Sequence, residues 1–198
     1  MARTIAKDHE QKRRHILETA ARVFAQEGIA RASVNQLALA CGISKANIYH
    51  YYGSKDDLLF DILDTYLSQL NARVQAVPIA DLAPKDALQR LLTEFLLAYE
   101  GMDHEHKIQT EGLPLLPAPQ QDVLRSYQRE MVQLLSGTIG HVAPDVFRAD
   151  AQKLRDTSMS VFVMLNWFYM WIRDADEPRR REYASLITRL SVNGLSGL

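Results

Sequence analysis

The stretch SVNQLALACGISKANIYHYYGSK, Ser33 to Lys55, decides the fold of this chain. Ser33 followed by Gln36 is a capping-box pattern for the start of a short helix, and Gly42 ends that helix after barely two turns. Ser44 caps a second short helix, whose polar and aromatic side chains are unsuited to a core. Two short helices joined by a tight glycine turn predict a helix-turn-helix, which presents its second helix to the major groove of DNA.

This second helix carries the side chains that a DNA-reading helix needs near its start. Lys45 and Asn47 lie in its first turn, where lysine can donate to guanine and asparagine can pair with adenine. The other candidates have groups suited to phosphate contacts, and these are Tyr49, His50, Tyr51, Lys55, Ser33 and Asn35. The alternative interpretation is that Tyr49 and Tyr51 pack against the protein and that His50 is simply exposed.

Charge is distributed unevenly along the 198 residues. Residues 1–55 hold nine Lys or Arg and four Asp or Glu, a net charge of +5, and the rest holds fourteen against twenty, a net charge of -6. The two sums give the overall charge of -1. A basic segment joined to an acidic one is expected where only the first meets phosphate, and the alternative is chance clustering on a solvated surface.

Apolar residues at helical spacing predict helices along the rest of the chain, and no alternating pattern predicts a strand. The predicted helices cover residues 12–26, 54–74, 85–99, 120–142, 146–174 and a last one from Pro178, with a short helix or loop at 103–112. The prolines of LPLLPAPQQ predict an extended connector after Gly112. We therefore expect an all-α protein of about nine helices, with a helix-turn-helix DNA-binding domain at 1–55 and a ligand-binding and dimerisation domain at 56–198.

The segment GISKANIYHYYGSKDDLL, Gly42 to Leu59, resembles the signature of the tetracycline-repressor (TetR) family of bacterial transcription regulators. The preceding KRRHILETAARVFAQEGIARASVNQLALACG fits the same pattern, so the resemblance covers roughly residues 1–65. It implies a homodimer, a helical body with a small-molecule pocket, and repression that a ligand relieves. By the same match, the family's DNA contacts fall on Ser33, Asn35, Ser44, Lys45, Asn47, Tyr49, His50, Tyr51 and Lys55.

The chain departs from the family pattern at three positions. Asn47 stands where threonine is commoner, Gly53 where proline is frequent, and Asn35 where a longer side chain is common. These departures leave the operator sequence open. A dimer with two heads about 34 Å apart is expected to read a palindromic operator in double-stranded DNA.

The stretch SVFVMLNWFYMWIRDA, Ser160 to Ala175, is apolar nearly all round, which predicts a helix buried on several sides. One face is expected to line a pocket and another to pack on a second subunit, the alternative being a monomer core. Asn166 needs a hydrogen-bond partner there, either a ligand or a group across the dimer. The candidate ligand-binding residues are Phe95, Tyr99, Tyr127, Met131, Phe162, Asn166, Trp167 and Met170.

Two classes of hydrophobic effector remain open. The segment NWFYMWIR loosely resembles the same region in family members that sense acyl-coenzyme A thioesters. Such a ligand needs cationic side chains for its phosphates, and Arg125, Arg129 and Lys107 are candidates. The alternative is an aromatic drug, as in a xenobiotic-responsive efflux regulator of the same fold.

The remaining features exclude other classes. Cys41 is predicted to be a buried small hydrophobe, and a single cysteine is compatible with a reducing compartment. Asp103-His104-Glu105-His106 is expected to be a solvated loop and no metal site. We find no catalytic motif, no cofactor signature, no signal peptide and no apolar run long enough for a membrane, so we expect a cytoplasmic regulator and no enzyme. A helical dimeric interaction protein without DNA binding leaves the basic segment unexplained.

Overall fold

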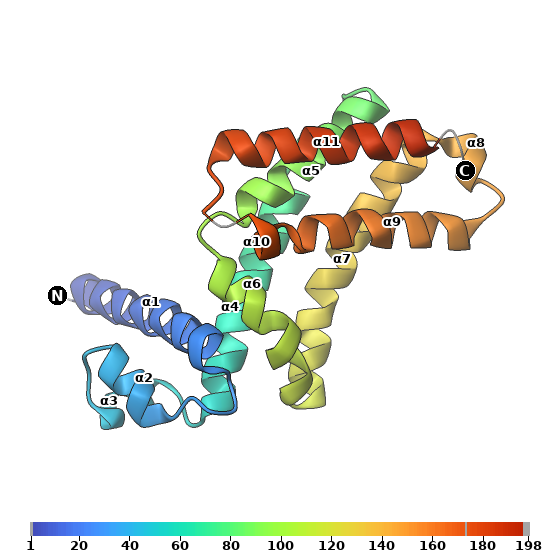
Figure 1. The fold of residues 1–198 in the computed structure, drawn as a ribbon. Helices are drawn as coiled ribbons and strands as arrows, with labels where there is room; N and C mark the ends of the chain where they lie inside the picture. Colours follow the sequence, from blue (N-terminus) through green and yellow to red (C-terminus); the bar gives the residue numbers. More distant parts are fainter. Residues whose placement is uncertain (1, 173, 196–198) are drawn as a thin grey trace. The chain divides into compact units, whose positions relative to one another are not determined.

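The structure, a computed structural model, describes residues 2–172 and 174–195, and within these ranges its regular secondary structure is helical, with no strand (Figure 1). This confirms the predicted all-α class. The elements are α1 (Ala2–Glu27), α2 (Val34–Ala40), α3 (Lys45–Tyr51), α4 (Lys55–Gln75), α5 (Pro84–Ala98), α6 (Asp103–Gly112), a 3₁₀ turn η1 (Leu113–Leu115), α7 (Ala118–Val142), α8 (Pro144–Phe147), α9 (Ala151–Asn166), α10 (Phe168–Trp171) and α11 (Glu177–Leu195).

The described chain divides into two compact units, and the divisions fall inside α4, between α5 and α6, and inside α7. The head unit comprises residues 2–66 and 102–124, and the body unit comprises residues 67–101, 125–172 and 174–195. The head unit therefore extends past the boundary that the sequence suggested at residue 55. It does so because α6 packs against α1, although the two helices are far apart in the sequence.

The core of the head unit holds the helix-turn-helix in place. Phe24 of α1, Leu37 of α2 and Ile48 of α3 are each almost completely buried. Close packing extends to α6, since a Cβ added at Gly112 would lie 3.0 Å from Ile29 Cδ1. Together these contacts make a rigid support for α3, because a packed apolar interior resists small displacements.

The body unit is built on α5, which packs against α9 and α11. Phe95 of α5 and Phe168 of α10 are fully buried. Arg180 of α11 is also buried, and its guanidinium donates to the backbone carbonyls of Ala175 and Leu96, both at 3.0 Å. Because a buried charge needs partners, these two bonds and the Phe168 ring beneath the guanidinium account for its position.

Several predicted boundaries were wrong. Helix α1 begins at Ala2 and not near Lys12, because the segment before the first buried residue, Ile16, has too few apolar residues at helical spacing to reveal it. The proline-rich connector is η1 followed by α7, since Pro119 lies in the first turn of α7, where its missing N–H has no partner to lose.

The single helix predicted over 146–174 is also wrong, since α8, α9 and α10 occupy this region. The Asp150 side chain accepts from Lys153 N at 2.8 Å, which starts α9 anew, and α9 ends at Asn166. The described residues thus contain eleven α-helical segments, where the sequence predicted about nine helices in the chain.

The segment expected as a solvated loop is helix α6, and His106 within it is buried. The hydroxyl of Tyr66 lies 2.7 Å from His106 Nδ1, which gives this imidazole a partner inside the head unit. No three His, Cys, Asp or Glu side chains of the described residues are grouped for a metal ion. None of the helices described here combines the length and apolar character that crossing a membrane requires.

Candidate DNA interface and effector region

Side-chain caps set the start of both helices of the helix-turn-helix. Ser33 Oγ accepts from Gln36 N at 3.2 Å, while Ser33 N donates to Gln36 Oε1 at 2.8 Å, which confirms the predicted capping box. Ser44 Oγ accepts from Asn47 N at 3.2 Å and starts α3. Gly42 between them has φ +66°, a conformation that favours glycine, so the turn depends on it.

Helix α3 turns one apolar side chain inward and its polar side chains outward. Ile48 is buried, whereas Lys45, Asn47, Tyr49 and His50 are exposed. Lys45 Nζ lies 5.7 Å from the centre of the Tyr49 ring, so this exposed pair occupies neighbouring turns of one face. These four side chains form an accessible surface with several hydrogen-bond donors, as reading a DNA groove requires.

Tyr51, in contrast, packs α3 against α1. Its ring centre lies 4.8 Å from that of His9 and 5.5 Å from that of His50, and the residue is half-buried. The next residue, Tyr52, is buried and its hydroxyl donates to Asp61 Oδ2 at 2.7 Å. Arg13 of α1 donates to the same carboxylate, so Asp61 joins the C-terminal end of α3 to α1 and α4. Burial and the bond to Asp61 raise the pKa of Tyr52, which stays a neutral donor.

The sequence missed this network because nothing in the spacing of residues 13, 52 and 61 indicates that they meet. They are brought together only in the tertiary structure, where Arg13 of α1 and Tyr52 both bond to Asp61 of α4.

Lys55 has a structural role within the head unit. Its ammonium donates to the carbonyls of Ile29 at 2.8 Å and of Ala30 and Ala32, both at 3.3 Å. These carbonyls belong to the connection between α1 and α2, which lies outside both helices. Lys55 therefore ties this connection to the first turn of α4.

A hollow of about 480 Å³ lies between parts of α1 and α3 within the head unit. Gln11, Lys12 and His15 line it from α1, opposite Asn47, His50 and Tyr51. His15 Nε2 also lies 3.2 Å from the carbonyl of Cys41. Cys41 itself is buried and burial raises the pKa of its thiol, which confirms the prediction of a small buried hydrophobe.

In the body unit, four of the candidate ligand-binding residues meet in two pairs. The rings of Phe95 and Phe162 contact edge to face with centres 6.0 Å apart. The hydroxyl of Tyr99 donates to Asn166 Oδ1 at 2.9 Å. Tyr99 is buried, which raises its pKa and keeps it protonated. The amide of Asn166 thus finds a partner within its own chain, whereas the sequence predicted either a ligand or a group across the dimer.

The other four candidates are more dispersed. Met131 is buried on α7 and Tyr127 is half-buried one turn earlier. Trp167 and Met170, in contrast, are 58% and 55% exposed. They belong to an exposed apolar face on α9, α10 and α11, which comprises Met159, Val163, Trp167, Met170, Trp171, Leu186 and Leu190.

The three cations suggested for a phosphate-bearing ligand differ in their surroundings. Lys107 Nζ donates to the carbonyl of Ala25 at 2.6 Å within the head unit. Arg125 and Arg129 lie one turn apart on α7 and are both exposed. Only this arginine pair belongs to the body unit, with Tyr99 and Asn166.

A capped helix-turn-helix with an exposed polar second helix, attached to a separate helical unit, defines the class of helix-turn-helix transcription regulators. Residues 16–62 match the family model for bacterial regulatory proteins of the tetR family, and residues 81–195 match the model for the tetracyclin repressor-like C-terminal domain. The chain belongs to the TetR family. This confirms the resemblance and the expectation of a DNA-binding regulator in place of an enzyme.

The comparisons with individual proteins agree. The HTH-type transcriptional repressor KstR2 of Mycobacterium tuberculosis (strain CDC 1551 / Oshkosh) is 27% identical over 179 residues, which cover 83% of this chain and 84% of that protein. A TetR-family regulator from Bordetella parapertussis 12822 superposes with a TM-score of 0.85 at 29% identity, covering 94% of this chain and 96% of the other. AibR in complex with isovaleryl coenzyme A and operator DNA has the same fold, with a TM-score of 0.73 at 22% identity and coverage of 90% and 97%.

Proposed function

We propose that this TetR-family regulator is a homodimeric repressor of a palindromic operator, which it leaves when a hydrophobic small molecule binds the body unit. The observation that carries the proposal is the exposed face of α3, where Lys45, Asn47, Tyr49 and His50 project from a helix anchored by buried Ile48. A regulator of this family needs such a face to bind DNA, and an exposed cluster of donors has no role in packing.

We assign different DNA-binding roles along the helix-turn-helix. Lys45 and Asn47 read base edges, because they lie nearest the start of α3. Tyr49, His50, Ser33, Asn35 and Ser44 contact the phosphate backbone. Tyr51 and Lys55 act mainly by holding the head together, since their contacts with His9 and with the α1–α2 connection occupy them.

The dimer is supported by the exposed apolar face of α9, α10 and α11. Seven large apolar side chains on this face are more than two-fifths exposed, and Trp171 is 67% exposed. An apolar surface of this kind is typical of an interface. A groove of about 300 Å³ between α9 and α11, which Val161, Met164 and Leu190 line, provides a hollow for side chains of a second subunit.

The effector is a hydrophobic molecule that contacts Phe95, Tyr99, Phe162 and Asn166. Tyr127 and Met131 belong to the same proposed site. Trp167 and Met170 are exposed, and we include them in the effector site only as residues that dimerisation would bring over the site from the second subunit. An acyl-CoA thioester is the first class to test, since AibR binds isovaleryl coenzyme A and Arg125 and Arg129 are exposed on α7. An aromatic drug is the alternative, favoured by the rings of Phe95 and Phe162.

The proposed switch is a shift between two populations of the dimer. The effector binds more tightly to the state in which the two heads do not match the operator spacing. A tenfold loss of DNA affinity requires about 1.4 kcal/mol of coupling. Helix α4 is the element through which this coupling acts, because its residues belong to both units and it follows the helix-turn-helix directly in the chain.

A two-stage experiment tests the proposal. The operator is first selected from random duplex DNA. The affinity of the parent protein and of Lys45→Met for this operator is then measured at several salt concentrations. A thermal-shift screen then compares acyl-CoA thioesters, their free acids and aromatic drugs. Thioesters that stabilise the protein and release the operator support an acyl-CoA sensor, whereas stabilisation by aromatic drugs alone supports the alternative. Operator binding that no stabilising compound changes would overturn the switch.

A further inference from the structure

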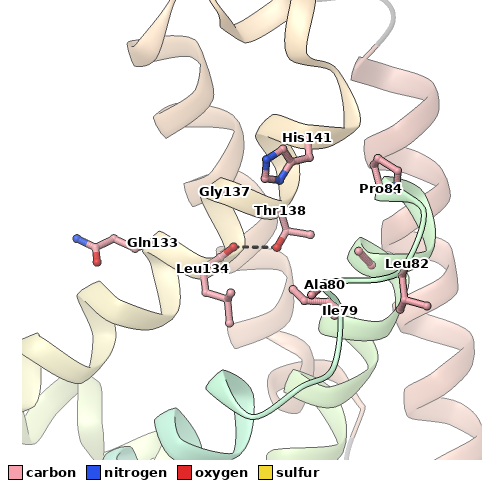
Figure 2. A pocket seen from close by; sticks show the side chains of 10 residues that line it. Ile79, Ala80, Leu82, Pro84, Gln133, Leu134, Gly137, Thr138 and His141 are labelled. Atoms are coloured by element: carbon pink, nitrogen blue, oxygen red, sulfur yellow. Dashed lines mark hydrogen bonds between the residues drawn. The ribbon is translucent and has the colours of Figure 1, made fainter.

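A further cavity lies in the body unit, at the start of α5, whereas Tyr99 follows the end of that helix. It has a volume of about 540 Å³, within the range of about 300–1,000 Å³ that small-molecule sites occupy. Five lining residues come from the α4–α5 connection and the start of α5, and five from the C-terminal half of α7. Figure 2 shows Ile79 and Ala80 of the connection facing Leu134 and Thr138 of α7 across the opening.

The lining of this cavity is mostly apolar and contains no Asp, Glu, Lys or Arg among its ten residues. The lining residues are Ile79, Ala80, Leu82, Pro84, Ala87, Gln133, Leu134, Gly137, Thr138 and His141. Because a phosphate or carboxylate removed from water needs a cation or several donors, this composition disfavours an anionic ligand. It equally disfavours the phosphates of a CoA thioester.

The polar groups of the cavity are few and lie on one stripe of α7. The hydroxyl of Thr138 donates to the carbonyl of Leu134 at 2.9 Å, so it can offer only lone pairs to a ligand (Figure 2). His141 lies one turn further along, in the last turn of α7, and its imidazole is exposed. The third polar lining residue, Gln133, points away from the connection in Figure 2. The remaining ring nitrogen and hydroxyl oxygen suit a ligand with a single carbonyl or hydroxyl group.

Gly137 keeps the middle of the α7 wall open. A Cβ added there would meet nothing within 4 Å, although the glycine lines the cavity. Glycine within a helix costs about 0.5–1 kcal/mol relative to alanine, so a helix interior ordinarily favours a larger residue. Here a larger side chain would project into free space and occupy the volume that a ligand needs.

We propose that this cavity binds a neutral, mainly apolar small molecule that carries one carbonyl or hydroxyl group. The apolar body of the ligand contacts Ile79, Leu82 and Leu134, and its polar group reaches His141. The site is separate from the residues around Tyr99 and Asn166. It depends on neither DNA binding nor dimerisation, so it stands or fails independently of the function proposed above.

Calorimetric titration of the full chain with α-tetralone, a neutral bicyclic ketone, tests the proposal. Gly137→Leu fills the cavity and is expected to weaken binding more than about tenfold, a loss of about 1.4 kcal/mol. Gly137→Ala changes the same backbone position but adds only a methyl group, and it should keep the affinity within about twofold. His141→Ala removes one hydrogen bond, for which we expect a loss of about two- to tenfold.

Two further measurements define the result that overturns the proposal. The anion 1-naphthoate, similar in size, should bind at least about tenfold more weakly than α-tetralone. Tyr99→Phe should leave α-tetralone binding unchanged, and circular dichroism should show Gly137→Leu folded. The proposal is wrong if folded Gly137→Leu binds like the parent protein, if the anion binds equally well, or if α-tetralone shows no saturable binding tighter than about 1 mM.

Discussion

Replacing Lys55 with methionine distinguishes a structural lysine from a phosphate-binding one. Methionine keeps most of the aliphatic stem but removes the ammonium, and with it the bonds to three carbonyls of the α1–α2 connection. Hydrogen bonds from a charged donor contribute about 1.5–3 kcal/mol to stability. The bond at 2.8 Å is of ordinary length and the two at 3.3 Å are long, so we count them together as one such interaction.

Two features reduce that figure. Lys55 is the first residue of α4, where the positive end of the helix dipole disfavours a cation by about 0.3–1 kcal/mol. The side chain is also only half-buried, so water replaces part of what is lost. We therefore expect Lys55→Met to lower the free energy of unfolding by about 1–2 kcal/mol.

Urea unfolding followed by circular dichroism measures this change. With a slope of about 2 kcal/mol per molar urea, the midpoint should fall by about 0.5–1 M. All samples should have one protein concentration, because dimerisation makes apparent stability depend on concentration. Lys45→Met is the matched control, since Lys45 is exposed on α3 and its removal should change stability by less than about 0.5 kcal/mol.

For DNA binding we expect the opposite order, with Lys45→Met having a larger effect than Lys55→Met. Lys45→Met should weaken operator binding markedly and, as far as Lys45 also interacts with phosphate, flatten the salt dependence by up to about 0.9 in the logarithmic slope. Lys55→Met should leave that slope unchanged. The structural role is refuted if Lys55→Met keeps the urea midpoint of the parent protein and flattens the salt slope.

Three further predictions concern stability. Gly28→Ala should destabilise the protein by about 1–2 kcal/mol because Gly28 has φ +86°, whereas Gly137→Ala should stabilise it by about 0.5–1 kcal/mol; equal urea midpoints for the two variants would contradict this. Burial, and then neighbouring carboxylates, raise the pKa of Glu105 above its value in the unfolded chain. The protonated form of Glu105 therefore stabilises the fold at low pH, and this stability is lost as the pH rises from the unfolded pKa through the folded pKa. Glu105→Gln should therefore gain stability over the parent between pH 4 and pH 7, and a difference that does not change with pH would show that Glu105 ionises as freely in the fold as in the unfolded chain. Arg180→Met should cost about 2–4 kcal/mol because it leaves two buried carbonyls without their donor, while exposed Arg179→Met should cost less than about 0.5 kcal/mol in the same unfolding assay.

The local structure of the helix-turn-helix could be predicted from the sequence because its determinants are neighbours in the chain. Ser33 and Gln36 cap one helix and Ser44 caps the next, each through bonds between residues three apart. Gly42 provides the left-handed turn between them. The inward position of Ile48 follows equally from spacing, so the exposed face of α3 was predictable as well.

Other boundaries were not predictable, because apolar spacing records only the turns that are buried. The segment of α1 before Lys12 gave no such signal, and the apolar stretch after Ser160 concealed the end of α9 at Asn166. The same stretch was expected to be buried on several sides, yet Trp167, Met170 and Trp171 are exposed. Apolar character alone does not distinguish a core from a surface that another subunit covers.

The sequence by itself determined the family, the all-α class, and the capped helices that present α3, since these depend on motifs and on contacts within a few residues. Only the tertiary structure decided what the long side chains do. Lys55 bonds to the α1–α2 connection, Asn166 accepts from Tyr99, and Arg180 bonds to a carbonyl of α5. Each of these bonds joins residues more than twenty positions apart, and a donor's choice among distant acceptors is fixed only when the helices pack.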